Sequence, residues 1–311
     1  MRDAFSDALV HVALNDPKVL LLTGDHGYAL FDEFRKRCPD QYINAGIAEQ
    51  NMVGMAAGLA RVGFRPFVYG LSAFVPIRTV EQIKLDIAHD DLPVVLLGDG
   101  AGFVYSHLGT SHQSTEDIAC TRAIPGLAVL SPADRHEMTA CMHYAYAAKS
   151  PIYLRMGKSD RGDVHAEPLP ALVPGELILV RRGRDDRIAF IATGSMVRTA
   201  MDAAESLDAT VWSAPVIKPL NVATVCDAAL GSTRIVVLEE HSVLGGLGSA
   251  ITEILAEHHP TRVLRIGVAD RFSEHCGTYA YLLREHGLDL DTVRARVERF
   301  SGALVAAETS P

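Results

Sequence analysis

The stretch "INAGIAEQNMVG", Ile43 to Gly54, sets one carboxylate, that of Glu49, among small and apolar residues where a helix begins. Apolar residues then recur at helical spacing as far as Leu59, which predicts a helix with one buried face. An acid in this place is either an anion favoured by the dipole at a helix start or a group held for chemistry. Local spacing does not separate the two, so the rest of the chain has to decide.

The composition is that of an ordinary globular protein with an acidic balance. The chain has 311 residues, of which 48% are hydrophobic and 22% charged, and its formal net charge is -9. This length suffices for about two domains, each with its own core. The negative charge argues against nucleic acid as the main partner, because binding to a phosphate backbone needs a basic face. Small anionic substrates are compatible with it, since a few local arginines can oppose the global sign.

Neither a disulfide framework nor a targeting segment is predicted. The five cysteines are odd in number and form no CxxC pair, so a disulfide scaffold or a zinc cluster is not indicated. The N-terminus lacks a basic region followed by an uninterrupted apolar run, and no run of about 18 apolar residues occurs. We therefore expect a soluble, cytoplasmic protein that has no membrane partner.

Short apolar runs alternate with helical patterns along the chain. The run "KVLLLTGD", Lys18 to Asp25, shows no polar alternation, which is typical of a strand covered on both faces. Similar runs are "RPFVYGL", "PVVLLGDG", "GLAVLSP" and "PIYLRMG", and later "RIAFIATGS", "ATVWSAP", "RIVVLEEH" and "RVLRIGV". Strand after helix after strand predicts an α/β protein with two doubly wound, mostly parallel sheets. We place the first domain at 1–160, a linker rich in Gly, Pro and charge at 161–180, and a second domain at 181–311.

Polar residues cluster directly after the strands of the first domain. In parallel α/β sheets, ligands collect at the carboxyl ends of strands, in the loops that follow. We therefore expect these loops to form one site. The residues concerned are Asp25 and His26 after the first strand, Phe74 after "PFVYG", His107 and His112 in "YSHLGTSHQ", and Arg155 in "PIYLR".

Six motifs follow one another in a fixed order, namely "GIAEQNMVGMAAGLA", "FVYGLSAF", "HLGTSHQSTEDIA", "ATGSMV", "IKPLN" and "EEHSVLGGLGSA". Together they resemble the second half of a transketolase-type thiamin-diphosphate enzyme. Each motif is weak alone, but their order makes the resemblance specific over about Asp3 to Phe300. The resemblance implies a pyrimidine-binding domain followed by the C-terminal domain of that family.

For Glu49 the resemblance implies a catalytic role. Glu49 matches the family's glutamate, which hydrogen-bonds a ring nitrogen of the cofactor's aminopyrimidine and so activates thiamin diphosphate. The surrounding residues suit this role, because a carboxyl group among Ile47, Ala48 and Met52 is desolvated and can share a proton with the pyrimidine. The cofactor carries the chemistry, and the protein supplies orientation and electrostatics.

Phe74 matches the aromatic residue that stacks on the pyrimidine in the family, a contact that suits a flat heteroaromatic ring. The alternative is an ordinary core phenylalanine. Family transketolases often carry another aromatic residue three positions further on, where this chain has Ile77. Ile47 and Ile77 are the remaining predicted cofactor contacts.

His112, in "GTSHQ", matches a family histidine near the reactive end of the cofactor. An imidazole there can bind substrate oxygens or move protons near neutral pH; the alternative is a solvated loop histidine. Arg155 aligns with an arginine that often grips a sugar phosphate, and its alternative is a surface ion pair. Asp25, His26 and His107 occupy the right loops without a firm motif match, and we predict them as substrate contacts.

Two departures from the family bear on the substrate. Sugar-phosphate transketolases have an acidic residue four positions before the histidine that His112 matches, and this chain has Leu108 there. A second family histidine, in a "THD" motif, is replaced by "GDG", Gly98 to Gly100. An altered donor or acceptor sugar is therefore expected.

The "GDG" itself is not expected to bind metal. In the family, a GDG followed by an asparagine holds magnesium and diphosphate through hard oxygen ligands. The corresponding window here, about 120–130, contains no asparagine. We predict no metal ligand in this chain and only half of a cofactor site.

The resemblance therefore implies a split enzyme. An N-terminal transketolase subunit would hold the diphosphate and Mg2+ (or Ca2+), and the thiamin diphosphate would lie between the two chains of a heterotetramer. The expected activity is transfer of a two-carbon ketol unit from a ketose to an aldose. Two alternatives stay open: the β subunit of an oxo-acid dehydrogenase decarboxylase component, and a non-catalytic assembly subunit.

Overall fold

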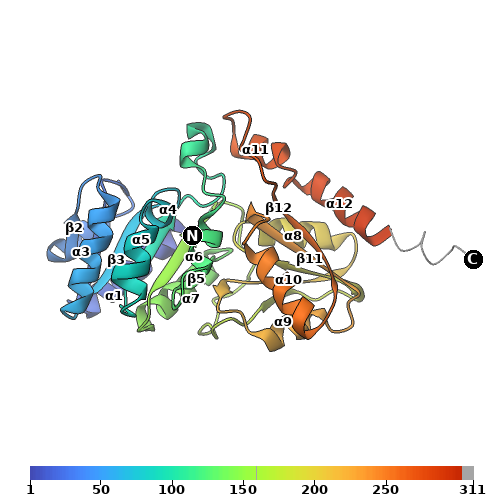
Figure 1. The fold of residues 1–311 in the computed structure, drawn as a ribbon, viewed down its shortest axis with the longest axis horizontal. Coiled ribbons are helices and arrows are strands. Elements are labelled where there is room, and N and C mark those ends of the chain that lie inside the picture. Colours follow the sequence, from blue (N-terminus) through green and yellow to red (C-terminus); the bar gives the residue numbers. More distant parts are fainter. Residues whose placement is uncertain (159, 303–311) are drawn as a thin grey trace, which may run out of the picture.

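Two sheets organise the chain in the computed structural model, which describes residues 1–158 and 160–302. Within these residues the first sheet has seven strands in the order β10-β5-β6-β4-β3-β1-β2, and the second has five in the order β12-β11-β8-β9-β7. Figure 1 shows the sheets side by side with helices packed against them. The prediction of two doubly wound, mostly parallel sheets is confirmed. Residue 159 and residues 303–311, which we assigned to the first and second domains, lie outside the described part.

The first sheet uses the short apolar runs of the sequence, with two additions at its edges. Its strands are β1 (Val19–Thr23), β2 (Tyr42–Asn44), β3 (Arg65–Leu71), β4 (Val95–Asp99), β5 (Ala128–Leu130), β6 (Ile152–Met156) and β10 (Val216–Lys218). Its helices are α1 (Arg2–Asn15), α2 (Asp32–Arg37), α3 (Glu49–Arg61), α4 (Val75–Arg78), α5 (Val80–Gln82), α6 (Asp117–Arg122) and α7 (Arg135–Ala147). A π-helical segment, Ile83–Ala88, continues α5.

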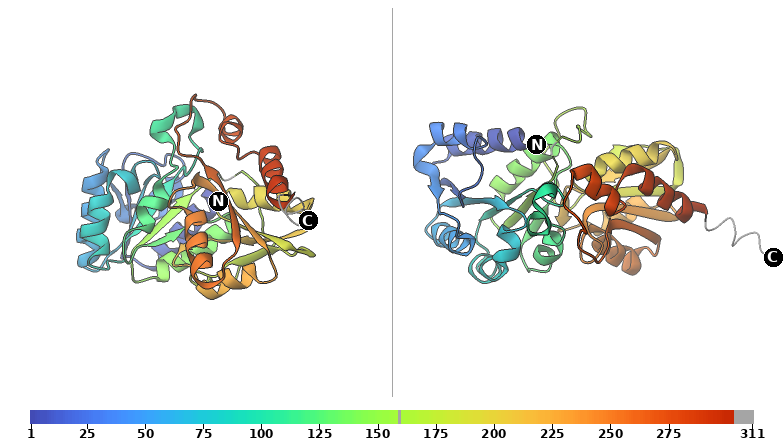
Figure 2. Two further views of the ribbon diagram at one scale, coloured as in Figure 1. Left: turned by 45° about the vertical axis from the view of Figure 1, so that its right-hand side comes forward. Right: turned by 90° about the horizontal axis from the view of Figure 1, so that it is seen from above.

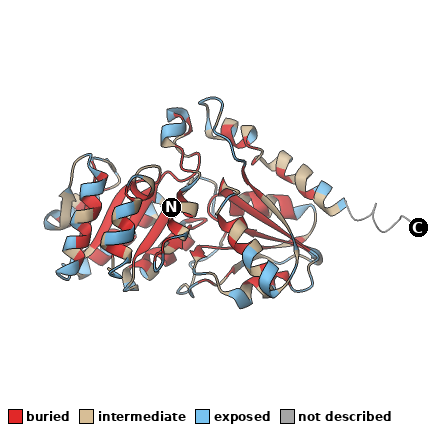
Figure 3. Ribbon diagram, viewed as in Figure 1, coloured by how far each residue is buried: buried red, intermediate tan, exposed pale blue. Residues whose placement is uncertain are grey.

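Alternate residues of β1 face opposite sides of the first sheet. Leu20 and Leu22 join a core with residues of α3, whereas Val19 and Leu21 join a core with residues of α1 and α7. Helices thus cover both faces, which explains why the strand shows no polar alternation. In Figure 3 the central strands of this sheet are buried and the outer faces of the helices are exposed.

The second sheet forms the core of the other half. Its strands are β7 (Ile178–Arg181), β8 (Asp185–Ala192), β9 (Ala209–Ser213), β11 (Arg234–Ser242) and β12 (Arg262–Val268). Its helices are α8 (Met196–Glu205), α9 (Val222–Ala229), α10 (Leu247–His258), α11 (Tyr279–Glu285) and α12 (Leu290–Gly302). Strand β7 pairs antiparallel with β9 and begins inside the segment that we predicted as linker.

One strand crosses from the second half of the sequence into the first sheet. β10 lies antiparallel to β5, with Val216 opposite Leu130. The Lys218 ammonium group strengthens this junction by donating to the carbonyl oxygens of Arg122 (2.9 Å) and Ile124. A three-residue strand is too short to show a period, so the sequence did not reveal it. The two halves are therefore joined through a shared sheet as well as through the linker.

The halves also meet at the edge where the loops of the first sheet emerge. Two views show the loop after β4 beside the segment that leads from β12 into α11 (Figures 1 and 2). Helix α11 contacts the short turn Ser106–Leu108 in that loop.

Among the described residues, none of the helices has both the length and the hydropathy that a membrane crossing requires.

Candidate active site

Four loops of the first domain meet at the carboxyl edge of its sheet. They follow β1, β2, β3 and β4, which are the neighbouring strands at one side of the sheet. Because these strands are parallel, the segments that follow them emerge at the same edge. This is the edge at which ligands collect in α/β sheets.

Glu49 is the first residue of α3, the helix that follows β2. Its side chain is buried, with the whole residue 4% exposed, and Arg78 donates to its Oε1 at 3.0 Å. The predicted enclosure is only partly present, since Met52 is fully buried but Ile47 is 74% exposed and Ala48 is also exposed. The burial of Glu49 therefore arises from its place at the start of α3 against the sheet, and Ile47 presents its side chain to the surface.

Phe74 lies at the centre of the site, immediately before α4, and its ring is half-buried. The guanidinium carbon of Arg78 lies 4.2 Å from the ring centroid. His112 meets the ring edge-on with a centroid separation of 5.2 Å, and the ring of His26 lies 6.4 Å away. A half-buried phenylalanine that contacts a guanidinium group and an imidazole ring is not an ordinary core residue.

Arg78 is a site residue that the sequence analysis missed. It bridges Glu49 and Phe74, the first through a hydrogen bond and the second through its ring. Arg78 stands four residues after Phe74, which is one helical turn, and this spacing could have pointed to it. Its side chain is 47% exposed, so it can leave the carboxylate without breaking the core. Ile77, the neighbouring predicted contact, is half-buried in α4.

The loop after β4 supplies the histidines. His112 ends a short 3-10 turn, Thr110–His112, and its Nδ1 lies 2.9 Å from the hydroxyl oxygen of Ser111. His107 and Leu108 belong to the preceding turn and both are exposed. The structure thus brings His112 against Phe74, and His107 lies exposed in the preceding turn.

Asp25 is exposed at the start of the loop that follows β1. Its backbone φ is 63°, a left-handed conformation that aspartate tolerates better than most residues. Its Oδ1 accepts a hydrogen bond of 3.2 Å from the hydroxyl of Tyr28. His26, the next residue, turns toward Phe74, so the two predicted substrate contacts of this loop lie in different surroundings.

Arg155 lies in surroundings that argue against the predicted anion contact. It is 3% exposed, and its Nε and Nη2 donate to the two carboxylate oxygens of Asp117 at 2.8 and 3.0 Å. Burial alone raises the pKa of Asp117, but the Arg155 guanidinium outweighs it and holds that pKa below its usual value. The hydroxyl of Tyr153 donates to the same carboxylate at 2.7 Å. The ion pair named as the alternative is therefore present, and it is internal rather than on the surface.

The carboxylate of the "GDG" motif is also engaged within the fold. Asp99 ends β4 and is 4% exposed, and its Oδ2 accepts from the hydroxyls of Tyr69 at 2.7 Å and Tyr105 at 2.9 Å. Burial and this carboxylate raise the pKa of Tyr69 and of Tyr105. Within the described residues, no group of three or more His, Cys, Asp or Glu side chains could hold a metal ion.

The residues present fit one end of a thiamin-type cofactor. A buried carboxylate at a helix start, a half-buried aromatic ring and a histidine lie within contact of one another or of Arg78. A carboxylate can accept from a protonated ring nitrogen, and an aromatic ring can stack on a flat heterocycle. These groups match an aminopyrimidine and not a diphosphate, which would need a metal or several cations.

Both halves of the chain match models of one protein family. The family model described as transketolase, pyrimidine binding domain, matches residues 1–162, and the model described as transketolase, C-terminal domain, matches residues 176–293. A 1-deoxy-D-xylulose-5-phosphate synthase from Azoarcus sp. (strain BH72) is 37% identical over 299 residues, which cover 94% of this chain and 47% of that protein. The chain thus spans about half the length of this relative.

Other matches extend over nearly the whole length of both proteins. An apulose-4-phosphate transketolase subunit of Phocaeicola vulgatus is 33% identical over 298 residues, 94% of each chain. A solved structure described as a split gene transketolase, inactive beta4 tetramer, superposes with a TM-score of 0.86 and 34% identity over 96% of both chains. The two halves are therefore the pyrimidine-binding and C-terminal domains of a transketolase-type protein. The chain belongs to the transketolase family, and the resemblance found in the sequence is confirmed.

Proposed function

We propose that this chain is the C-terminal subunit of a split transketolase that transfers a two-carbon ketol unit from a ketose to an aldose. The observation that carries the proposal is the contact of Phe74 with His112 beside the buried carboxylate of Glu49. Relatives of matching length that are named as transketolase subunits support it. They favour it over the oxo-acid dehydrogenase alternative, and the intact Glu49 site favours it over a non-catalytic assembly subunit.

In this proposal the cofactor is thiamin diphosphate, which supplies a carbon nucleophile and an electron sink when bound. Glu49 accepts a hydrogen bond from the pyrimidine of the cofactor. This bond replaces the one that Arg78 donates to Glu49 in the structure. Phe74 stacks on the ring, with Ile47 and Ile77 beside it. A buried carboxylate that points at a bound heterocycle keeps its geometry without help from solvent.

The substrate side of the proposed site consists of His112, His26, His107 and Asp25. Imidazole groups at this edge can donate to sugar oxygens and move a proton near neutral pH. Leu108, 47% exposed, stands where family members have an acid. This supports a modified or phosphorylated sugar that places no hydroxyl against that position. Arg155 is left out of the substrate set because its donors are engaged by Asp117.

The rest of the proposed enzyme is a partner. We propose an N-terminal transketolase subunit that holds the diphosphate and Mg2+ (or Ca2+), with which the chain assembles as a heterotetramer and on which its activity depends. The division into domains at 1–160 and 181–311 belongs to the same proposal. A cytoplasmic location is supported by the five cysteines, all of which are free.

The test is reconstitution of both chains with thiamin diphosphate and magnesium, comparing wild type with Glu49→Gln. The variant is expected to lower the rate of ketol transfer by about 10²- to 10⁴-fold, the usual effect of losing a positioned proton-transfer group. Glu205→Gln, at the exposed end of α8, is the matched control and should leave the rate unchanged. Unchanged turnover in Glu49→Gln at full cofactor loading would sink the assignment. Turnover by this chain alone would refute the need for a partner.

A further inference from the structure

The loop that carries His107 and His112 is closed at its base. We call residues 100–116 the histidine loop. The backbones of Gly102 and Ser114 pair with each other, through hydrogen bonds of 2.8 and 2.9 Å. Between these two residues the loop makes only short 3-10 turns, so local structure gives it little stiffness of its own.

The second domain holds the start of this loop. The backbone N–H of Phe103 donates to Oε1 of Glu240, in β11, at 2.6 Å. The other oxygen of Glu240 accepts from the hydroxyls of Ser195 and Tyr279, so the carboxylate is fixed on both sides. Gly102 has a φ of 66°, and a Cβ there would come within 2.3 Å of Oε1 of Glu240. The loop can therefore approach this carboxylate closely only because that residue is glycine.

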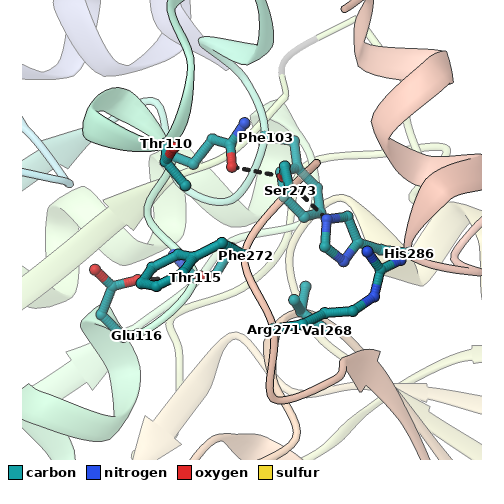
Figure 4. A pocket seen from close by; sticks show the side chains of 10 residues that line it. Phe103, Thr110, Thr115, Glu116, Val268, Arg271, Phe272, Ser273 and His286 are labelled. Carbon is teal, nitrogen blue, oxygen red and sulfur yellow. Dashed lines mark hydrogen bonds between the residues drawn. The ribbon is translucent and has the colours of Figure 1, made fainter. Parts of the chain in front are cut away.

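The second domain also holds the end of the loop, at the residue next to His112. The hydroxyl of Ser273 donates to Oε1 of Gln113 at 2.8 Å, and Nε2 of His286 lies 3.0 Å from the same hydroxyl oxygen. The ring of His286 stacks on Phe103 with a centroid separation of 4.7 Å and an interplanar angle of 21°. Figure 4 shows Ser273 between the loop and His286, at the wall of a narrow pocket.

These hydrogen bonds have a direction. The one hydrogen of the Ser273 hydroxyl is used toward Gln113, so its oxygen accepts from the Nε2–H of His286. Burial lowers the pKa of His286, and the nearby Arg271 lowers it further against the opposing charge of Glu285. A neutral imidazole with its proton on Nε2 meets this requirement. The relay thus runs from His286 through Ser273 to Oε1 of Gln113.

We propose that His286 and Ser273 are positioning residues that act through Gln113 to set the place of His112 in the proposed active site. Gln113 follows His112 directly, so a fixed Gln113 side chain limits the backbone that carries the imidazole. The role of the C-terminal domain is then to hold the histidine loop against Phe74. The inference rests on the proposed function for the catalytic role of His112, but the contact itself does not depend on it.

The first measurement is independent of activity. Hydrogen exchange by mass spectrometry on the full chain follows the amides of the histidine loop in wild type, Ser273→Ala and Ser273→Thr. Loss of the relay in Ser273→Ala should speed exchange of the loop about five-fold, the factor that one neutral hydrogen bond is worth. Ser273→Thr keeps the hydroxyl and should restore slow exchange. Ser206→Ala removes a hydroxyl contact at the residue that follows α8 and should leave the loop unchanged.

The second measurement is kinetic and uses the reconstituted complex. In Ser273→Ala and in His286→Phe, which keeps an aromatic ring on Phe103, kcat should fall about tenfold. The affinity for thiamin diphosphate should stay at the wild-type value, because Glu49 and Phe74 lie outside the relay. His286→Gln, whose amide can donate in place of Nε2–H, should recover most of kcat. A substitution that merely destabilises the protein would instead lower the fraction of active complex, which active-site titration measures. Such an effect would not distinguish these variants from one another.

The outcomes distinguish the two proposals. Faster loop exchange in Ser273→Ala, reversed in Ser273→Thr, supports the relay even if the complex shows no ketol transfer, in which case the proposed function fails. Wild-type exchange in Ser273→Ala overturns the relay, whatever the activity. An active complex in which Ser273→Ala and His286→Phe keep the wild-type kcat overturns the positioning role.

Discussion

The buried pair between Arg155 and Asp117 leads to a quantitative prediction. Arg155→Leu removes the guanidinium and leaves the Asp117 carboxylate inside the protein, where the hydroxyl of Tyr153 still donates to it. The two side chains are 4% and 0% exposed, so water cannot replace the lost partner. Breaking such a pair from one side costs about 3 to 5 kcal/mol, because a buried charge is left uncompensated. Against a total stability of about 5 to 15 kcal/mol, this is a large loss.

Equilibrium unfolding in urea measures the effect, and the control comes from the surface. Arg61→Leu breaks an ion pair with Asp90 whose side chains are 51% and 38% exposed, and it should cost at most about 1 kcal/mol. The double variant Arg155→Leu with Asp117→Leu removes the stranded charge and should regain part of the stability lost in the single variant. A loss below about 1 kcal/mol in Arg155→Leu, together with a raised KM for a phosphorylated sugar, would refute this reasoning and return Arg155 to the substrate site.

The remaining predictions concern the cofactor and pH. Phe74→Leu should weaken thiamin diphosphate binding to the complex about two- to twelvefold, measured by calorimetry, because a stacked ring is worth about 0.5 to 1.5 kcal/mol. Phe272→Leu, at an 83% exposed position, is the control, and equal effects of the two substitutions would contradict the stacking role of Phe74. Burial raises the pKa of Glu239 from 4.5 to about 7, so its contribution to stability is present in full below pH 4.5 and is lost as the pH rises through 7. This amounts to about 3 kcal/mol. The free energy of unfolding of the wild type minus that of Glu239→Gln should fall as the pH rises from 4.5 to about 7. A difference that does not change with pH would show that the carboxyl titrates normally.

The sequence predicted the strands that local pattern defines. The sequence analysis correctly predicted strands at the apolar runs of β1, β3, β4 and β6, because a strand buried on both faces needs apolar residues at every position. The short edge strands β2, β7 and β10 were missed. Three or four residues carry no period, and their pairing partners lie far away in the chain.

The candidate site was predictable in its parts but not in its contacts. Glu49, Phe74 and His112 could be named because ordered motifs follow successive strands, and parallel strands bring such loops to one edge. The contact of Arg78 with Glu49 depends on how α4 packs beside α3, which no motif encodes. The same holds for Arg155, whose residue type fits an anion site and a buried ion pair equally well.

The sequence by itself determined the class of fold, the order of the loops and the family, because these depend on patterns within a few residues and on their succession. The tertiary structure decided which polar side chains are engaged by partners within the protein. Arg155 is engaged by a carboxylate 38 positions away, and the histidine loop is held by Glu240, which follows Phe103 by 137 positions. A side chain's partners at such separations are set by the path of the whole chain. The acid in "INAGIAEQNMVG" was visible from the start, but its burial and its arginine were not.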